Sequence, residues 1–560
     1  MIYPKIPLAQ TVIALCKAKN ITDIVLSPGS RNAPLTIGFT HDDFFNAYSV
    51  VDERCAAFFA MGISQQTRRP SALVCTSGSA LLNYYPAVCE AFYSDIPLIV
   101  ISADRPAEKI DIGDGQTIRQ ENVYANHILF SANLIEGEDE FNEAQIQIAL
   151  HTAVTQKGPV HINVPFEEPL YEVVEADVPV FKPWFPEVMP EADEHAWTAE
   201  FLERWNSAQR KMILVGVNHP GDIPREYLDV LGKDPSVIVF TETTSNLHHP
   251  DFFPGIDKII APIEKTEEAL EKLRPELLLT FGGLVVSKKI KAFLRKYAPK
   301  WHYHVDAKKA YDTFFCLTYH FKTDPATFFA NSIPAMHYVA GDYRAYWSEA
   351  KERREKKHDM YTESTPFSDF KVYHHIFQAI PERQLLQFSN SATIRYAQLF
   401  AMKTGWQIFC NRGTSGIDGS TSTAIGASVA SGLPATLVTG DLSFFYDSNA
   451  LWNNYKREDF RIIVVNNGGG GIFRILPGHK NTDNFDTYFE TVHGLSAEHL
   501  CKMYGLTYIK ADHEAGLKKG LKLLYEEAEG PRLLEVFTPR TVNDGVLIDY
   551  FRHLSDNFDE

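Results

Sequence analysis

The chain has 560 residues, of which 45% are hydrophobic and 22% charged, and its formal net charge at pH 7 is −17. This balance is typical of a folded globular enzyme, and the length exceeds what one hydrophobic core usually supports, so we expect three domains. The acidic charge disfavours binding to nucleic acid or to anionic membrane surfaces, and no apolar run approaches the length of a membrane span.

The seven cysteines are scattered and form no CxxC pair. This pattern favours reduced thiols over a disulfide framework or a zinc site. The opening stretch MIYPKIPLAQTVIALCKAKN has no basic start, long apolar run or cleavage site, so it predicts no secretory signal. We therefore expect a soluble, cytoplasmic protein without a nucleic-acid or membrane partner.

The first third of the chain alternates short apolar or β-branched runs with helix-like stretches. The runs are ITDIVL, NAYSVV, SALVCT and PLIVISA, and each ends in a turn. Strands separated by helices indicate βαβ units and a parallel sheet. A stretch rich in proline and acidic residues, between Glu167 and Trp197, interrupts this rhythm, as domain linkers commonly do. We place the first domain at residues 1–180.

Two further α/β units follow. The second, at 198–345, carries the strand candidates KMILVGV, SVIVFTET and ELLLTFGG. The charged segment YWSEAKERREKKHDMY comes next, and we expect it to link or pack between domains. The third unit, at 367–560, carries QLLQFSN, QIFCNRG, ATLVTGDLS and RIIVVNN. The predicted class is α/β, with three doubly wound domains on mainly parallel sheets, and the similar style of the outer units leaves an internal duplication open.

Polar residues follow two neighbouring strands of the third unit. Gly440-Asp441-Leu442-Ser443 comes after ATLVT, and Asn466-Asn467-Gly468-Gly469 follows RIIVV. Loops at the carboxyl ends of neighbouring strands form the crevice where open α/β sheets bind ligands. A carboxylate, an amide oxygen and a backbone carbonyl are hard ligands that suit Mg²⁺. Each half is also a common structural turn, but the pair at this spacing favours a metal-bound diphosphate.

These motifs resemble those of the thiamine-diphosphate enzyme superfamily, in which a GDG-type turn is followed by NN. Leu442 departs from that pattern, which has glycine there. The resemblance implies thiamine diphosphate and an Mg²⁺ ion held by Asp441, Asn467 and the carbonyl of Gly469. It also implies that Glu53, in SVVDERCAAFFAMGIS, is catalytic and hydrogen-bonds the cofactor's aminopyrimidine ring. The ordinary alternative for Glu53 is an acidic residue in the first turn of a helix.

Further motifs narrow the resemblance to the 2-succinyl-5-enolpyruvyl-6-hydroxy-3-cyclohexene-1-carboxylate synthases of menaquinone biosynthesis. They are SPGSRNAPL at 27–35, DERCAAFF at 52–59, TSGSA at 76–80, ADRP at 103–106, NRG at 411–413, SGIDG at 415–419, and IF with LP within 472–477. The resemblance implies a transferase that decarboxylates 2-oxoglutarate and adds the succinyl carbanion equivalent to isochorismate. It also implies a homodimer or homotetramer with active sites at the subunit interface.

The same resemblance assigns individual contacts. Both substrates are polyanions, which an acidic protein can bind only through a local cluster of cations. The cofactor contacts are Ser30, Glu53, Ile417, Asp441, Ser443, Asn467, Gly469 and Ile472. The substrate contacts are Arg31, Arg105, Gln116, Lys288, Asn390, Ser391, Arg395, Arg412, Phe473 and Leu476.

Several of these contacts have ordinary alternatives. Ile417 is implied to hold the cofactor bent, but core packing would also explain it. Asn390-Ser391 also resembles an ordinary helix N-cap, and any single arginine could be a surface ion-pair partner. Asp114, two residues before Gln116, departs from the family's GANQ-like turn and adds a negative charge.

Three other interpretations remain open from the sequence. The chain could be another thiamine-diphosphate 2-oxo acid decarboxylase or an acetolactate-type synthase, although pyruvate needs few cationic partners. It could be a non-catalytic α/β binding protein, although Glu53, Asp441 and Asn467 occur together. His302 and His304 share one strand face, but without a third ligand we expect them to be satisfied within the strand rather than bound to metal.

Overall fold

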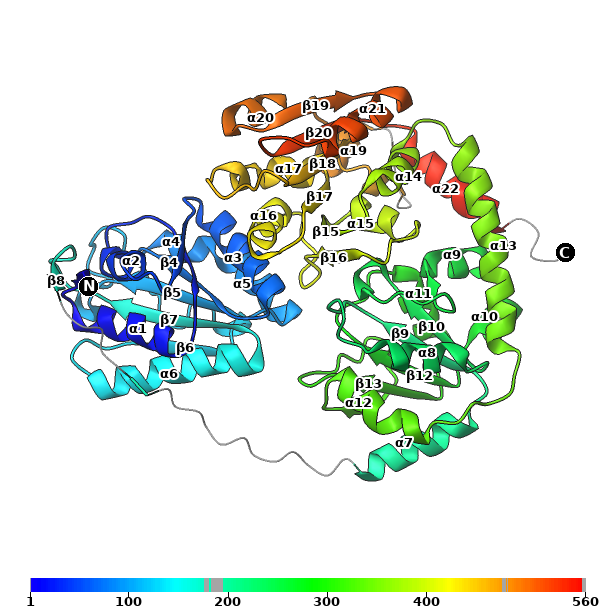
Figure 1. Ribbon diagram of the computed structural model, residues 1–560, viewed down its shortest axis with the longest axis horizontal. Coiled ribbons are helices and arrows are strands. Elements are labelled where there is room, and N and C mark those ends of the chain that lie inside the picture. Colours follow the sequence, from blue (N-terminus) through cyan, green and yellow to red (C-terminus); the bar gives the residue numbers. More distant parts are fainter. Residues whose placement is uncertain (1, 176–180, 183–194, 476–479, 481, 556–560) are drawn as a thin grey trace.

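The computed structural model describes residues 2–175, 181–182, 195–475, 480 and 482–555. They form three α/β domains, each built on a six-stranded sheet (Figure 1). Every strand pairing inside these three sheets is parallel. Most strands are continuous buried runs, because helices cover both faces of such sheets. The predicted class and three-domain architecture are confirmed, whereas the domain boundaries stay predictions.

The N-terminal domain has the strand order β3-β2-β4-β5-β7-β6. Successive side chains of β2 enter different cores, Ile24 on one face and Val25 on the other, so both faces of the sheet are buried. A separate antiparallel pair joins β1 (Ile2–Pro4) to β8 (Val173–Glu175). The remaining elements are α1 (Pro7–Ala18), β2 (Asp23–Leu26), α2 (Ala33–Thr40), β3 (Asn46–Ser49), α3 (Glu53–Thr67), β4 (Ser71–Cys75), α4 (Ser79–Asn83), α5 (Tyr85–Ser94), β5 (Leu98–Asp104), β6 (Phe130–Asn133), α6 (Asp139–Gln156) and β7 (Pro159–Pro165).

The central domain has the order β11-β10-β9-β12-β13-β14. The strand order reverses between β9 and β12, and in such sheets the crevice at this switch point is where ligands bind. Its elements are α7 (His195–Ser207), β9 (Lys211–Val215), α8 (Arg225–Lys233), β10 (Val237–Thr241), β11 (Phe253–Pro254), α9 (Ile256–Ile260), α10 (Glu267–Leu273), β12 (Leu277–Phe281), α11 (Lys288–Lys296), β13 (Trp301–Val305), β14 (Leu317–Phe321), α12 (Pro325–Ser332) and α13 (Tyr343–Ser364).

The C-terminal domain has the order β16-β15-β17-β18-β20-β19. The six strands of the N-terminal sheet, β2 to β7, are arranged in the same order as the six strands β15 to β20 of this sheet. This shared order supports the internal duplication that the sequence left open. Its elements are α14 (Asp369–Ala379), β15 (Gln384–Phe388), α15 (Ala392–Ala397), β16 (Trp406–Cys410), α16 (Ser420–Ala430), β17 (Ala435–Gly440), α17 (Asp441–Tyr446), β18 (Arg461–Asn466), α18 (Ile472–Ile475), α19 (Asp483–Phe485), α20 (Glu498–Tyr504), β19 (Thr507–Ala511), α21 (Glu514–Tyr525), β20 (Arg532–Phe537) and α22 (Asn543–Ser555).

Helices α3 and α16 join the two outer domains through direct backbone contact. A Cβ on Gly62 would lie 2.2 Å from the carbonyl oxygen of Thr423, and a Cβ on Gly426 would lie 2.0 Å from that of Phe59. Only glycine fits at either position. The buried side chains of both helices belong to one hydrophobic cluster, so the N- and C-terminal domains share a core.

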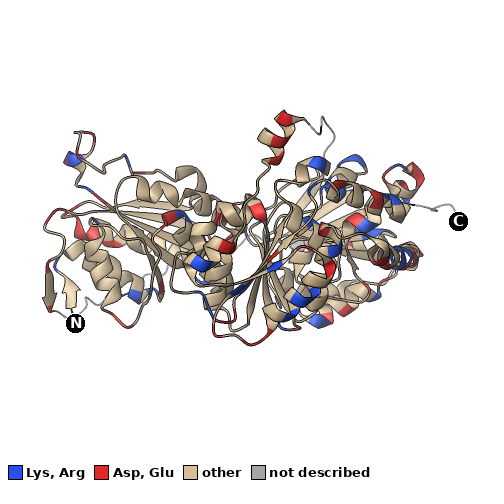
Figure 2. Cartoon of the chain, turned by 90° about the horizontal axis from the view of Figure 1, so that it is seen from above, with Lys and Arg blue, Asp and Glu red and all other residues tan. Residues whose placement is uncertain are grey.

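Helix α13 carries the charged segment and runs along the outer edge of the central and C-terminal domains (Figure 1). Trp347 packs in the central core, and His358 Nδ1 lies 2.8 Å from the hydroxyl of Tyr550 on α22. The helix therefore packs between domains as the sequence predicts. Acidic and basic residues are interspersed over all three domains (Figure 2). Among the described residues, no helix is both long and apolar enough to cross a membrane.

Candidate functional site

Four loops of the C-terminal domain leave the carboxyl ends of adjacent strands. Because β16, β15, β17 and β18 are parallel neighbours, these loops lie at one edge of the sheet. This edge is where doubly wound sheets bind their ligands. The strands β15, β16, β17 and β18 are followed in turn by Asn390, Arg412, Asp441 and Asn467.

Asp441 and Asn467 belong to loops that are bonded to each other. Asp441 Oδ2 accepts hydrogen bonds from the amides of Gly468 at 2.9 Å and Gly469 at 3.0 Å. His493 Nε2 also lies 3.3 Å from this oxygen. Gly469 has φ +155°, and a Cβ there would lie 2.7 Å from the carbonyl oxygen of Glu490, so the turn requires glycine. The two halves of the predicted metal motif are thus brought together.

Asn467 has an oxygen without a partner. Its Nδ2 donates to Asp369 Oδ2 at 2.9 Å, which orients the amide. Its Oδ1 is buried and makes no hydrogen bond within the described structure. Leaving a buried amide oxygen unpaired costs roughly 1–3 kcal/mol, and a bound cation would remove that cost. With the carboxylate of Asp441 nearby, the donor set fits Mg²⁺ and a diphosphate.

Asp369 is a residue that sequence reasoning missed. Burial raises the pKa of its carboxyl to about 6, hydrogen bonds from Thr538 and Asn467 oppose this shift, and the charge of Asp441 adds to it. Asp369 lies far from Asn467 along the chain and outside any motif, so no local pattern indicated it.

Ile417 does not pack in the core. Its side chain is 36% exposed, and its carbonyl oxygen accepts a hydrogen bond from the Ser443 hydroxyl at 2.7 Å. Ser443 therefore fixes the backbone that carries Ile417. Ile472 and Phe473 begin α18, and Phe473 is also exposed. Leu476 lies outside the described residues.

Cations gather where the central domain meets this edge. Lys288 is exposed at the first position of α11, and Lys291 is one turn further along the same helix. Burial lowers the pKa of Lys291, Glu242 opposes the shift, and Arg412 and Lys288 add to it. Burial and the neighbouring Arg412 likewise lower the pKa of Arg395. Sequence reasoning named all of these cations except Lys291, which lies in no motif.

Asn390 holds loops rather than facing outward. Its Nδ2 donates to the carbonyl oxygens of Asn411 at 2.6 Å and Gly416 at 2.7 Å, and its Oδ1 accepts from Arg412 Nη1 at 2.6 Å. Ser391 is the N-cap residue of α15, as the sequence predicts, but its side chain accepts no helix amide. Its φ of +66° is unfavourable for a non-glycine residue, and such strain concentrates at functional sites.

Two predicted arginines lie together in the N-terminal domain. Arg31 is buried and donates to the carbonyl oxygen of Phe166 at 3.0 Å and to Glu168 Oε1 at 3.1 Å. Burial, followed by the charge of Arg105, lowers its pKa. Arg105 Nη2 donates to the carbonyl oxygen of Gly115 at 2.8 Å. Ser30 and Gln116 are exposed in the loops after β2 and after β5, two strands that β4 separates in the sheet.

Glu53 fits both of its interpretations. It is the first residue of α3, whose N-cap Asp52 accepts the amide of Cys55 at 3.2 Å. Its carboxylate also accepts from Asn83 Nδ2 at 3.3 Å and lines a hollow with Trp452. Glu53 is therefore a first-turn acid that faces an open space.

The predicted residues form two groups in this chain. We call Ser30, Arg31, Glu53, Arg105 and Gln116 the N-terminal group. In the described part of the chain, no hydrogen bond or ion pair joins this group to the loops of Arg412, Asp441 and Asn467. Asp441, Asn467 and Gly469 are also absent from the lining of the hollow at Glu53.

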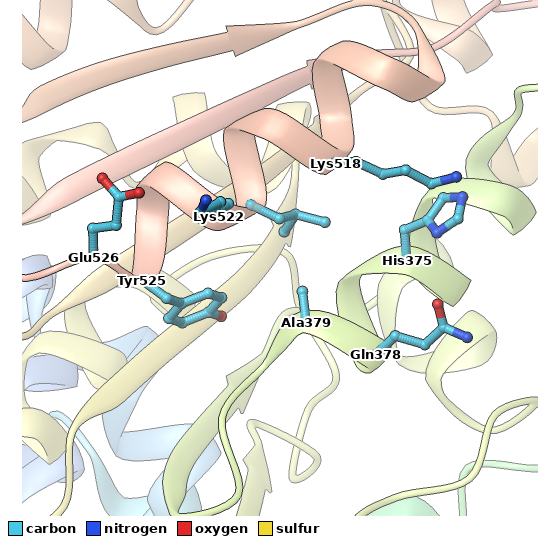
Figure 3. Close-up of a pocket in the computed structure, with 8 residues that line it drawn as sticks. His375, Gln378, Ala379, Lys518, Lys522, Tyr525 and Glu526 are labelled. Carbon is cyan, nitrogen blue, oxygen red and sulfur yellow. The ribbon is translucent and has the colours of Figure 1, made fainter.

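A second hollow lies between α14 and α21 and contains none of the predicted residues (Figure 3). Two of its lining residues, His375 and Lys518, contact Glu514 Oε1 at 3.0 and 2.8 Å. On the central sheet, His302 and His304 share Thr280 Oγ1, at 2.9 and 2.8 Å. Thr280 thus contacts one nitrogen of each imidazole, whereas the buried Nδ1 of His302 has no hydrogen-bond partner within the described structure. No group of three or more His, Cys, Asp or Glu side chains among the described residues is arranged to hold a metal.

Comparison with known proteins identifies the family. Residues 6–126 match the thiamine pyrophosphate enzyme N-terminal TPP binding domain, and residues 391–536 match the C-terminal one, thiamine pyrophosphate being thiamine diphosphate. A relative from Flavobacterium psychrophilum is 56% identical over 99% of this chain and 100% of its own length. A relative from Christiangramia forsetii is 55% identical over 99% of this chain and 100% of its own length. One from Porphyromonas gingivalis is 37% identical over 97% of this chain and 96% of its own length. All three relatives are named 2-succinyl-5-enolpyruvyl-6-hydroxy-3-cyclohexene-1-carboxylate synthase. The chain therefore belongs to the thiamine-diphosphate-dependent 2-succinyl-5-enolpyruvyl-6-hydroxy-3-cyclohexene-1-carboxylate synthases.

Proposed function

We propose that this enzyme decarboxylates 2-oxoglutarate and adds the succinyl unit to isochorismate, giving 2-succinyl-5-enolpyruvyl-6-hydroxy-3-cyclohexene-1-carboxylate and CO₂ for menaquinone biosynthesis. Family membership supports the reaction and the cofactor. The structural observation that carries the proposal is the set of cations Lys288, Arg395 and Arg412 at the edge of the sheet that bears Asp441. Cytoplasmic location and the lack of a nucleic-acid partner stay predictions.

The metal proposal rests on the donor atoms. Asp441, the unpaired Oδ1 of Asn467 and the carbonyl of Gly469 would hold Mg²⁺ against the diphosphate. Thiamine diphosphate, when bound, supplies the carbon nucleophile and electron sink that decarboxylation needs. The protein orients these donors, since Asp369 fixes the amide of Asn467 and two glycine amides fix Asp441.

The cations supply substrate specificity in this proposal. Both substrates carry two carboxylates, and guanidinium groups bind carboxylates through paired hydrogen bonds. Like charges held close together favour an anionic ligand, and Arg412 adds to the lowering of the pKa of both Lys291 and Arg395. A pyruvate-specific enzyme would need fewer of them, so an acetolactate-type reaction is disfavoured. The proposed contacts also include Ser391, Phe473 and Leu476.

We propose a homodimer, or a tetramer of such dimers, in which each active site takes residues from two subunits. Within the described part of one chain, no hydrogen bond joins Glu53 to Asp441 or Asn467, and neither of these residues lines the hollow at Glu53. The apolar side chains of Val51, Leu82 and Trp452 near Glu53 are exposed, and exposed apolar surface of this kind is typical of an interface. A second copy would bring its C-terminal loops to the hollow at Glu53.

The test is a direct assay of the purified protein with thiamine diphosphate, Mg²⁺, 2-oxoglutarate and isochorismate. We expect cofactor-dependent CO₂ release and an adduct of the expected mass. A parallel reaction replaces 2-oxoglutarate by pyruvate. Turnover with pyruvate alone would reassign the substrate, and turnover with neither would contradict the proposal.

A further inference from the structure

Two buried carboxylates contact the backbone directly beside a proposed substrate cation. Glu242, which follows β10, accepts the amides of Val286 and Ser287, both at 2.7 Å. Ser287 immediately precedes Lys288. The carboxylate therefore fixes the backbone at the start of α11 in two places.

The second carboxylate does the same beside Arg412. Glu90, on α5 of the N-terminal domain, accepts the amides of Gly413 and Thr414, both at 2.6 Å, and the Thr414 hydroxyl at 2.8 Å. A Cβ on Gly413 would lie 2.5 Å from the carbonyl oxygen of Glu90, so only glycine allows this approach. The loop after β16 is thus held from another domain.

Neither carboxylate has an ion pair within the described residues, although Glu90 is 1% and Glu242 is 4% exposed. Burying an ionised carboxylate costs several kcal/mol unless hydrogen bonds compensate. Desolvation accordingly raises the pKa of Glu242 to about 7, while the bonds from Val286 and Ser287 and the charge of Arg412 act against the rise. The backbone amides beside Lys288 and Arg412 are therefore the main groups that stabilise these two buried carboxylates.

The turn after Glu242 also reaches the C-terminal domain. Thr243 donates its amide to Gln398 Oε1 at 3.0 Å. Asn246 exchanges two hydrogen bonds with the backbone of Ile408 on β16, at 2.8 and 2.9 Å. Strand β16 leads directly to Arg412. The same turn therefore holds both the start of α11 and the strand that carries the second cation.

We propose that Glu90 and Glu242 are positioning residues for the anionic substrates, Glu242 acting through Lys288 and Glu90 acting through Arg412. The inference rests on the proposed function and extends it to residues that do not touch substrate. Cations on a fixed backbone lose less entropy when they bind a polyanion. Releasing either backbone should weaken binding of substrate and transition state alike, which raises KM and leaves kcat nearly unchanged.

Steady-state kinetics of Glu242→Gln and Glu90→Gln test this. In each glutamate the two carboxylate oxygens accept different backbone amides. Glutamine keeps the size but replaces one of these oxygens by an NH₂ group, so one of the two amides loses its acceptor. We expect KM for isochorismate or 2-oxoglutarate to rise about tenfold with kcat within about threefold. Asp42→Asn is the control, because Asp42 is a buried carboxylate that accepts the amide of Phe44 at 3.0 Å, ahead of β3. In the described part of the chain, Asp42, unlike the two glutamates, also forms an ion pair, with Lys17 at 2.7 Å.

Double-mutant cycles give the decisive readout. If Glu242 acts through Lys288, then E242Q-K288M should have the KM of K288M alone, and E90Q-R412M should match R412M. If the effects of the two substitutions on KM were additive, or if E242Q and E90Q had the wild-type KM, the positioning role would be wrong. The proposed reaction would be unaffected by either result. If E242Q does not fold, E242D serves, since its shorter carboxylate cannot span both amides. A wild-type protein that neither turns over nor binds 2-oxoglutarate in calorimetry would overturn the proposed function as well.

Discussion

At the scale of single residues, the best-defined chemistry is the orientation of Asn467. Asp369 takes its amide hydrogen, so Oδ1 is left buried without a partner near Asp441. A metal ligand that is oriented by a neighbour binds more tightly than a free one, because the neighbour has already restricted its rotation.

We predict that Asn467→Leu weakens Mg²⁺ binding about 10- to 100-fold, since the substitution keeps the volume but removes the oxygen ligand. Calorimetric titration of Mg²⁺ with thiamine diphosphate present measures the change. Asn331→Leu, at an exposed position of α12 in the central domain, is the control. Unchanged Mg²⁺ affinity in Asn467→Leu would remove this side chain from the metal site.

Glu53 should matter for turnover rather than for cofactor retention. We predict that Glu53→Gln binds Mg²⁺ and thiamine diphosphate nearly as wild type does but loses turnover by about 100-fold or more, because the amide cannot exchange a proton with the ring. Parallel titrations and CO₂-release assays separate the two effects. Wild-type rates would exclude Glu53 from the mechanism.

The sequence predicted those site residues that lie in contiguous motifs. Asp441, Asn467 and Glu53 each sit next to a strand or helix boundary that the sequence pattern indicates. Asp369 and Glu242 could not be found in this way, because each acts on a segment distant in sequence. Only the tertiary fold shows that Asp369 contacts Asn467 and that Glu242 contacts the backbone before Lys288.

At the scale of elements, the crossing of α3 and α16 decides how the outer domains meet. Its closest contacts are made by Gly62 and Gly426, at distances where no other residue fits. Glycine inside a helix costs roughly 0.5–1 kcal/mol relative to alanine. Close packing of two domains offsets that cost here.

We predict that Gly426→Ala destabilises the protein by about 3 kcal/mol, because the added methyl group would overlap the carbonyl of Phe59 and force the helices apart. Urea unfolding measures the loss. Gly432→Ala is the matched control, since a Cβ there meets nothing within 4 Å. Equal stability of the two variants would show that the crossing tolerates a wider separation.

Most strands that the sequence predicted are continuous buried runs, although the predicted β3 is mostly exposed. The buried strands β7 and β20 were not among the candidates. Strands such as β5 and β18 have apolar centres, are buried at every position, and were assigned from the pattern. Strands β14 and β19 were missed because they lie at sheet edges and are only partly buried, so no apolar run marks them. Strand order could not be derived from local pattern, since it depends on contacts between distant segments.

At the scale of the whole molecule, buried groups of opposite charge type respond oppositely to acid. Burial lowers the pKa values of His161, His302 and His358 to about 3. It raises those of Asp369 and Asp447 to about 6. Below pH 6.5 these histidines bind protons in the unfolded chain but not in the folded chain. Their contribution to the free energy of unfolding therefore decreases as the pH is lowered. As the pH is lowered, the two aspartates bind protons in the folded chain at a higher pH than in the unfolded chain. Their contribution to the free energy of unfolding therefore increases as the pH is lowered.

A single substitution separates these contributions. In the wild type, the His161 imidazole stays neutral in the folded chain and is protonated only on unfolding, which lowers the free energy of unfolding by about 1.4 kcal/mol per pH unit below about pH 6. We predict that this decrease is absent in His161→Gln. Urea unfolding at pH 7.5 and pH 5 measures the difference between the two proteins. A stability difference that does not change with pH would mean that His161 can be protonated in the folded state.

The proposed assembly makes the sharpest demand on the molecule as a whole. Glu53→Gln and Asp441→Asn should each be inactive alone, since each removes one half of every site. If a site takes Glu53 from one subunit and Asp441 from the other, a mixed dimer contains one intact site and one doubly altered site. Unfolding and refolding an equal mixture should then restore about a quarter of wild-type activity, because half of the dimers are mixed and each has one working site of two. If both residues act within one chain, the mixture stays inactive, and the active site would have to close within a single subunit.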